Sequence, residues 1–180
     1  MQLAITVLGN NHINFIGEIL PVVRDCNCNI LEIRSSHLGQ SVAAYLLIQG
    51  NWNQIAKFEN TLDSIQKRLE IKVHTLRPDQ KDKDKDKDKG KDCIPYSLET
   101  ISLDKDSVVE SITSFLFDRD ISIEEITGSS YQAPYIQSAV FSTKFIVLIP
   151  QQLPLLSLRE EFLDFCDHLN IDAILEPIKR

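Results

Sequence analysis

Four cysteines carry the side chains best suited to nucleophilic, redox or metal chemistry: Cys26, Cys28, Cys93 and Cys166. Cys26 and Cys28 are separated by one residue, whereas the cysteines of a zinc knuckle are separated by two to four, and no second close pair exists. The chain does not resemble a short secreted scaffold held by disulfides. We therefore expect free thiols, buried or half-buried, in a reducing compartment.

The other candidate catalytic groups are four histidines and two adjacent carboxylate pairs: His12, His37, His74, His168, Glu124-Glu125 and Glu160-Glu161. The histidines are scattered and do not have the spacing of metal ligands. The sequence holds no glycine-rich phosphate loop and no Gly-x-Ser-x-Gly elbow. We expect a protein that is not an enzyme and that uses no metal or cofactor.

Charge is distributed unevenly along the 180 residues, whose formal net charge is −7. Residues 1–76 contain six basic and six acidic side chains, whereas residues 96–180 contain six basic and fourteen acidic ones. A protein that grips duplex DNA usually supplies about 6–10 cationic contacts to phosphates. Direct nucleic-acid binding is therefore not expected. No apolar run approaches the roughly 18 residues of a membrane span, and the first residues lack the pattern of a signal peptide, so we expect a cytoplasmic protein.

Residues 77–95 interrupt the chain with a strict Lys-Asp alternation between residues 81 and 89. In a helix this alternation would place like charges at i and i+4, and in a strand it would leave nothing to bury. We interpret 77–95 as a charged flexible linker between two domains, 1–76 and 96–180.

Each half has the apolar periodicity of the same unit. In the first half, short apolar runs at 3–8, 29–36, 42–49 and 71–76 predict strands, and helical spacing predicts helices at about 14–26 and from Asn51 to Leu69. In the second half, strands are predicted at 97–103, 121–127, 139–149 and 171–175, around a turn region at 128–138. Capping patterns at Ser107-Glu110 and Ser157-Glu160 predict its two helix starts.

The resulting order, βαββαβ twice, predicts an α+β protein with two ferredoxin-like domains in tandem. Ile30, Glu32 and Ile33 match Ile123, Glu125 and Ile126 at an offset of 93, and Leu69 and Ile71 match Leu169 and Ile171 at an offset of 100. This repetition indicates duplication. In residues 42–48 both the odd-numbered and the even-numbered side chains, which point to opposite faces of the sheet, are apolar. We therefore expect the sheets to be buried on both faces, by packing together or through oligomerisation.

The segments 3–9, 26–30, Leu38-Gly39 and Gly50-Asn51-Trp52-Asn53 resemble the N-terminal ACT domain of the glycine cleavage system transcriptional repressor family, and 117–123 is similar to its second ACT domain. The resemblance implies negative regulation of the glycine cleavage operon through contact with a DNA-bound LysR-type transcriptional activator, with glycine as a possible effector that relieves it. It also implies a homo-oligomer. Alternatives are an ACT-type amino-acid sensor that regulates a metabolic enzyme in trans, or an adaptor that binds no ligand.

By the same resemblance, an effector would bind the loop between the first strand and the first helix: Gly9, Asn10, Asn11, His12 and Asn14. The family usually carries an acidic-basic-Pro-Gly turn there, and Asn14 replaces its glycine; Asn tolerates unusual backbone angles better than most residues. The equivalent second loop, 104–107, is anionic and better suited to an ammonium group. We expect Trp52 to anchor the core, with a role in partner contact as the alternative.

Overall fold

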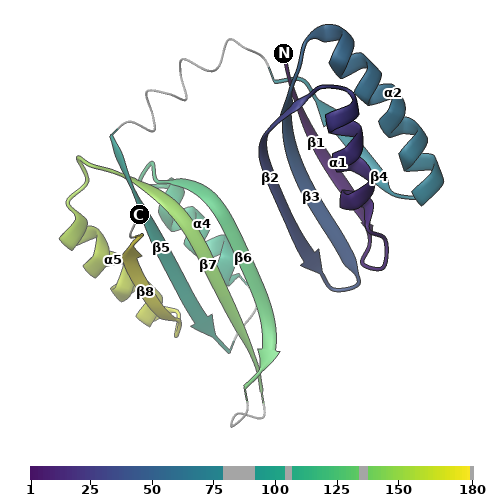
Figure 1. Ribbon diagram of the computed structural model, residues 1–180. Helices are drawn as coiled ribbons and strands as arrows, with labels where there is room; N and C mark the ends of the chain where they lie inside the picture. Colours follow the sequence, from purple (N-terminus) through teal and green to yellow (C-terminus); the bar gives the residue numbers. More distant parts are fainter. Residues whose placement is uncertain (79–91, 104–106, 134–137, 179–180) are drawn as a thin grey trace. The chain divides into compact units, whose positions relative to one another are not determined.

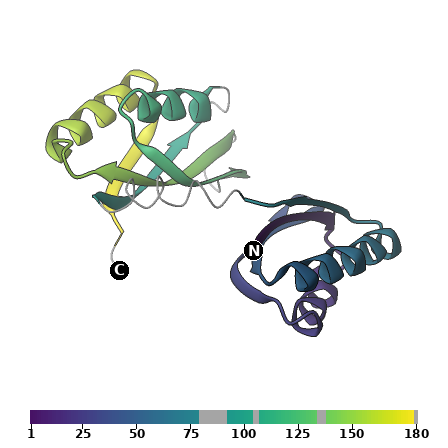
Figure 2. The ribbon, with the colours of Figure 1, turned by 90° about the horizontal axis from the view of Figure 1, so that it is seen from above.

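The computed structural model describes residues 1–78, 92–103, 107–133 and 138–178. The chain divides into two compact units, Met1–Lys81 and Asp82–Arg180, each built on one four-stranded sheet with two helices on one face (Figures 1 and 2). This is the α+β architecture of two tandem ferredoxin-like units that the sequence predicts, and it is confirmed.

Unit 1 contains β1 (Gln2–Asn10), α1 (Phe15–Asp25), β2 (Asn29–Leu38), β3 (Ser41–Gln49), α2 (Trp52–Leu69) and β4 (Lys72–Leu76). Its strands are antiparallel in the order β2-β3-β1-β4. Alternate residues of β1 and β3 meet the apolar stripes of both helices in one core. Helix α2 begins with the predicted capping box, in which the Gln54 amide donates to Asn51 Oδ1 at 2.9 Å and the Asn51 amide donates to Gln54 Oε1 at 2.7 Å.

Unit 2 contains β5 (Cys93–Ser102), α4 (Val108–Phe117), β6 (Ser122–Gln132), β7 (Ala139–Pro150), α5 (Leu155–His168) and β8 (Asp172–Pro177), in the sheet order β6-β7-β5-β8. The backbone repeats that of unit 1 in detail. Asn27 and Asp120, 93 residues apart, both adopt positive φ, as do Glu70 and Asn170, 100 residues apart. Both β2 and β6 carry a register shift at equivalent places, between Ile30 and Glu32 and between Ile123 and Glu125. These matches recur at the offsets found in the sequence.

The helix start predicted at Ser107 is confirmed, since Ser107 is the N-cap of α4, but neither Ser107 nor Ser157 makes the predicted capping bond. Ser107 has φ +65° and makes no side-chain capping bond, because an N-cap serine needs extended backbone to reach the first-turn amides. Helix α5 begins two residues before Ser157, after Pro154, so the Ser157 hydroxyl lies inside the helix and donates to Glu161 at 3.2 Å.

Two strands of unit 2 are longer than predicted. β5 begins at Cys93, so residues 93–95 belong to the sheet and not to the linker; Pro95 is tolerated because β8 joins β5 only from Tyr96 onward. β6 runs to Gln132 and pairs Ser129 with Ser142, so this part of the predicted turn is strand. The remainder of the predicted linker, 79–91, and of the turn, 134–137, lies outside the described residues.

One burial prediction is wrong. Trp52 is 63% exposed, because it is the first residue of α2 and the buried stripe begins one turn later at Ile55. In β3, Val42, Ala44, Leu46 and Ile48 are buried on the helical face, and Tyr45 on the opposite face is 53% exposed within its own unit. Covering of that face by the other sheet or by a second copy stays a prediction.

Candidate functional site

The loop from Gly9 to Asn14 connects β1 to α1 and is held against the turn between β2 and β3. The Asn11 amide donates to the Gln40 carbonyl at 3.0 Å, and the Ile13 amide donates to the Asn10 carbonyl at 3.1 Å. These bonds fix the loop backbone from both sides. The side chains of Asn10, Asn11 and His12 are exposed, so the structure brings three polar groups together on one short, fixed segment.

Asn14 serves as a helix cap and not, as the sequence suggested, as a residue that tolerates an unusual backbone angle. Its φ is −80°, which any residue adopts, and its Oδ1 accepts a hydrogen bond from the Gly17 amide at 3.1 Å, so Asn14 is the N-cap of α1. Gly17 leaves space for this cap, because a Cβ at that position would lie 2.6 Å from Asn14 Nδ2. The Phe15 amide donates to the Ile13 carbonyl at 2.9 Å. Two amides at the helix N-terminus are therefore already engaged.

Gly9 is the packing element of the loop. A Cβ at this position would lie 2.8 Å from Ile71 Cγ2 and 3.3 Å from the Phe15 ring. The missing side chain lets the end of β1 approach both α1 and the residue before β4. What remains for an effector is the exposed edge formed by Asn10, Asn11 and His12. The carboxamides of Asn10 and Asn11 can both donate to a carboxylate and accept from an ammonium group.

The equivalent region of unit 2 is more polar inside. Thr100 and Thr143 are each 1% exposed, and their hydroxyl oxygens are 2.5 Å apart; Ser102 is 5% exposed on the same face of β5. By strand register these threonines take the places that Val7 and Ala44 hold in unit 1. Sequence reasoning missed this pair, although aligning the strands of the two units would have found it, with Val7 matched to Thr100 at an offset of 93 and Ala44 matched to Thr143 at an offset of 99. Residues 104–106 of the predicted second loop lie outside the described residues.

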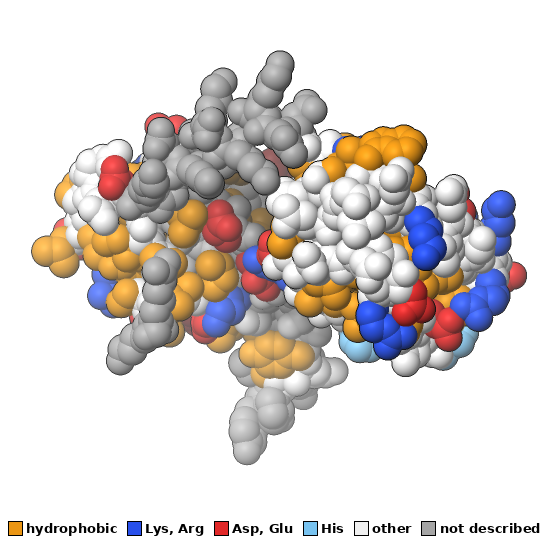
Figure 3. All heavy atoms as spheres, turned by 45° about the horizontal axis from the view of Figure 1, so that its top comes forward, with side chains coloured by type: hydrophobic (Ala, Val, Ile, Leu, Met, Phe, Trp, Pro, Cys, Tyr) orange, Lys and Arg blue, Asp and Glu red, His pale blue; other side chains and the backbone are white. Residues whose placement is uncertain are grey.

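Trp52 is the largest apolar side chain exposed at one end of unit 1. Its helix follows Gly50, which is joined to the chain start by two hydrogen bonds, Met1 N to Gly50 O at 3.0 Å and Gly50 N to Met1 O at 3.1 Å. Met1 is 38% exposed, and Ile30, paired with Ile48 near the same end of β3, is 42% exposed. Hydrophobic side chains reach the surface of both units (Figure 3). The exposed side chains of Met1, Ile30 and Trp52 are together named the Trp52 surface below.

The cysteines have the properties of structural thiols. None of the four forms a disulfide; Cys26, Cys28 and Cys166 are buried and Cys93 is half-buried, as predicted. Burial raises the pKa of Cys28, and it raises the pKa of Cys166 to about 12. A raised pKa withholds the reactive thiolate. In the described ranges, no group of three or more His, Cys, Asp or Glu side chains is placed to hold a metal ion, and no helix is long and apolar enough to cross a membrane.

Comparison with known proteins finds sequence similarity within unit 1. Residues 1–75 match the model of the ACT domain. Over 60 residues the chain is 37% identical to the glycine cleavage system transcriptional repressors of Escherichia coli (strain K12) and Shigella flexneri, an alignment that covers 33% of this chain. It spans only 32% of the length of those curated relatives.

Solved structures share the whole two-unit fold. The crystal structure of a protein assigned as a glycine cleavage system transcriptional repressor superposes with a TM-score of 0.73 at 22% identity. That of an unknown protein from Galdieria sulphuraria superposes with a TM-score of 0.78 at 17% identity. Each match covers 99% of this chain and 98% of the other. At these identities the likeness establishes the fold of both units.

Proposed function

We propose that the chain, whose residues 1–75 match the model of the ACT domain, is a negative transcriptional regulator of the glycine cleavage operon. It acts in the cytoplasm through contact with a DNA-bound LysR-type activator, and glycine relieves the repression. The observation that carries the proposal is the 37% identity of its ACT unit to glycine cleavage system transcriptional repressors. That similarity supports a regulatory role; the activator and the effector are the proposed details.

Charge supports contact with a protein and not with DNA. Residues 96–180 have eight more acidic than basic side chains, so phosphates would be repelled, and residues 1–76 are neutral overall. The Trp52 surface supplies an apolar contact instead. Tryptophan is enriched among the residues that dominate binding energy at protein interfaces. An exposed Trp that contributes little to its own core therefore fits a partner contact.

The loop at Asn10, Asn11 and His12 is the proposed glycine site. Glycine offers a carboxylate and an ammonium group within a few ångströms, and two exposed carboxamides on a fixed backbone can meet both. Because the Asn14 cap already engages the Gly17 amide, the loop side chains carry the recognition. The same engagement favours the alternative of an adaptor without an effector. An amino-acid sensor that regulates a metabolic enzyme in trans would keep this loop but bind a different protein.

The test is the affinity of the full chain for the purified activator, measured by sedimentation velocity with and without glycine. We expect a complex that glycine weakens, and an Asn11→Ala variant that binds the activator but no longer responds to glycine. Asn60→Ala, on the exposed side of α2 away from the loop, is the matched control and should respond normally. The run without activator also measures the proposed homo-oligomer. A chain that does not bind the activator under either condition contradicts the proposal.

A further inference from the structure

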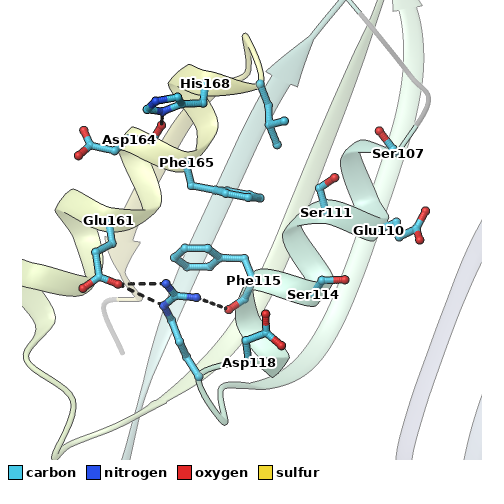
Figure 4. A pocket seen from close by; sticks show the side chains of 12 residues that line it. Ser107, Glu110, Ser111, Ser114, Phe115, Asp118, Glu161, Asp164, Phe165 and His168 are labelled. Carbon is cyan, nitrogen blue, oxygen red and sulfur yellow. Dashed lines mark hydrogen bonds and ion pairs between the residues drawn. The ribbon is translucent and has the colours of Figure 1, made fainter.

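A groove with a cavity volume of about 790 Å³ runs between α4 and α5 on the helical side of unit 2 (Figure 4). Phe115 and Phe165 lie between the two helices, with their ring centroids 4.9 Å apart. Along α4 the groove is lined by the small side chains of Ser107, Ser111 and Ser114, which leave it open. The groove therefore combines an aromatic floor with one wall of short polar residues.

Carboxylates from both helices line this groove: Glu110 and Asp118 from α4, and Glu161 and Asp164 from α5. Two basic side chains, Arg119 and His168, lie among them. The acidic excess matches that of the whole unit, in which fourteen acidic residues oppose six basic ones over 96–180. An occupant that complements this lining carries positive charge.

Arg119 shows how the groove holds a guanidinium. Its guanidinium carbon lies 3.7 Å from the centroid of the Phe115 ring, Nη2 donates to Glu161 Oε2 at 3.1 Å, and Nη1 donates to the Phe115 carbonyl at 3.1 Å. Stacking on an aromatic face combined with a carboxylate contact is the arrangement that favours arginine over lysine. The groove offers a second aromatic ring, Phe165, and two further carboxylates, Asp118 and Asp164.

The groove distinguishes unit 2 from its duplicate. An ion pair joins the two helices in both units, Arg68–Glu18 in unit 1 and Arg119–Glu161 in unit 2, but α1 and α2 approach each other more closely than α4 and α5 do. Unit 1 is also neutral overall over residues 1–76. The fold alone therefore does not require an open acidic groove.

From the acidic lining, the aromatic floor and the guanidinium arrangement, we propose that the groove between α4 and α5 binds an arginine-containing basic segment of a partner protein. The class of partner rests on the proposed function, since a DNA-binding activator presents basic side chains. Nucleic acid does not fit, because the lining carboxylates repel phosphates. The groove would thus contact the partner through charge, in addition to the apolar Trp52 surface.

The test uses the full chain and two labelled peptides of identical length, one with arginine and leucine alternating and one with lysine in place of arginine. Fluorescence anisotropy measures both dissociation constants at low and physiological salt. We expect saturable binding that is several-fold tighter for the arginine peptide. The double variant Asp118→Asn, Asp164→Asn should weaken arginine-peptide binding by about tenfold. The matched control is Glu160→Gln, Asp167→Asn, which removes the same charge from exposed residues of α5 outside the groove.

Equal weakening by both double variants would show attraction to bulk charge and overturn the proposal. Equal affinity for the two peptides, or no binding, would overturn it as well. The result is separable from the proposed function, because no activator, promoter or glycine enters the experiment. If the activator binds the groove double variant as well as the unaltered chain, its contact lies elsewhere and the proposal for this groove is refuted while the proposed function stands.

Discussion

The buried hydroxyl pair of unit 2 gives the sharpest stability prediction. Thr100→Val replaces a hydroxyl by a methyl group of similar size, so the core keeps its volume. The Thr143 hydroxyl, 1% exposed, then loses the partner that lies 2.5 Å away. A buried polar group left without a hydrogen bond costs about 1–3 kcal/mol. We expect the same loss for Thr143→Val.

The double variant Thr100→Val, Thr143→Val should recover most of this loss, because it removes both polar groups together. Unit 1 already holds this arrangement, with Val7 and Ala44 at the same register positions in a fully apolar core. The two single changes are therefore expected to be strongly non-additive, with an interaction energy of about 1–3 kcal/mol.

Amide hydrogen exchange, read by mass spectrometry on peptides from β5 and β7, measures the opening free energy of unit 2. A loss of about 1–3 kcal/mol makes exchange roughly 5- to 150-fold faster in each single variant. Peptides from β1 and β3 of unit 1 in the same sample are the internal control and should not change. Additive losses in the double variant, or single variants as stable as the unaltered chain, would refute the hydrogen-bond argument.

Three further outcomes follow from the packing and the thiols. Trp52→Ala should change the unfolding free energy of unit 1 by less than about 1 kcal/mol in urea titration, because the side chain is 63% exposed. A loss above about 2 kcal/mol would show that Trp52 packs in the core after all. Gly9→Ala should destabilise unit 1 by about 1–3 kcal/mol in the same titration, since its Cβ would lie 2.8 Å from Ile71 Cγ2, and a neutral result would show that Ile71 can move. Burial raises the pKa of Cys166 from 9.0 to about 12, so this thiol should resist iodoacetamide at pH 8 while half-buried Cys93 reacts. Because only the unfolded chain ionises the Cys166 thiol readily, its contribution to stability is lost as the pH rises from about 9 towards 12. A urea midpoint for unit 2 that stays constant over that pH range would contradict this predicted loss of stability.

Periodicity and duplication were sufficient to predict the fold. The order of strands and helices follows from apolar spacing, since a helix and a strand bury residues with different periods. The offsets of 93 and 100 also identify positions of shared backbone geometry, such as Asn27 with Asp120 and Glu70 with Asn170. A capping-box pattern correctly predicted a capping bond only where the N-cap backbone is extended, as at Asn51, and not at Ser107, whose φ is positive.

The surface could not be predicted in the same way. Whether Trp52 is buried depends on where the sheet ends relative to the first turn of α2, and residue type alone does not determine this. The acidic lining of the groove follows from the composition of unit 2, but the groove itself exists because α4 and α5 approach each other less closely than α1 and α2, and composition does not determine that packing. For the loop, the residue types indicated a binding site, but only the hydrogen bond from the Gly17 amide to Asn14 Oδ1 identifies Asn14 as the helix cap.

A mobility shift on a glycine cleavage promoter tests whether this chain regulates through a protein and not through DNA. Lanes compare this chain alone, the LysR-type activator alone, and both together with and without glycine. We predict no shift by this chain alone, and a slower complex with both proteins that glycine reverses. A shift by this chain alone would contradict the claim, as would a promoter–activator complex that this chain leaves unchanged.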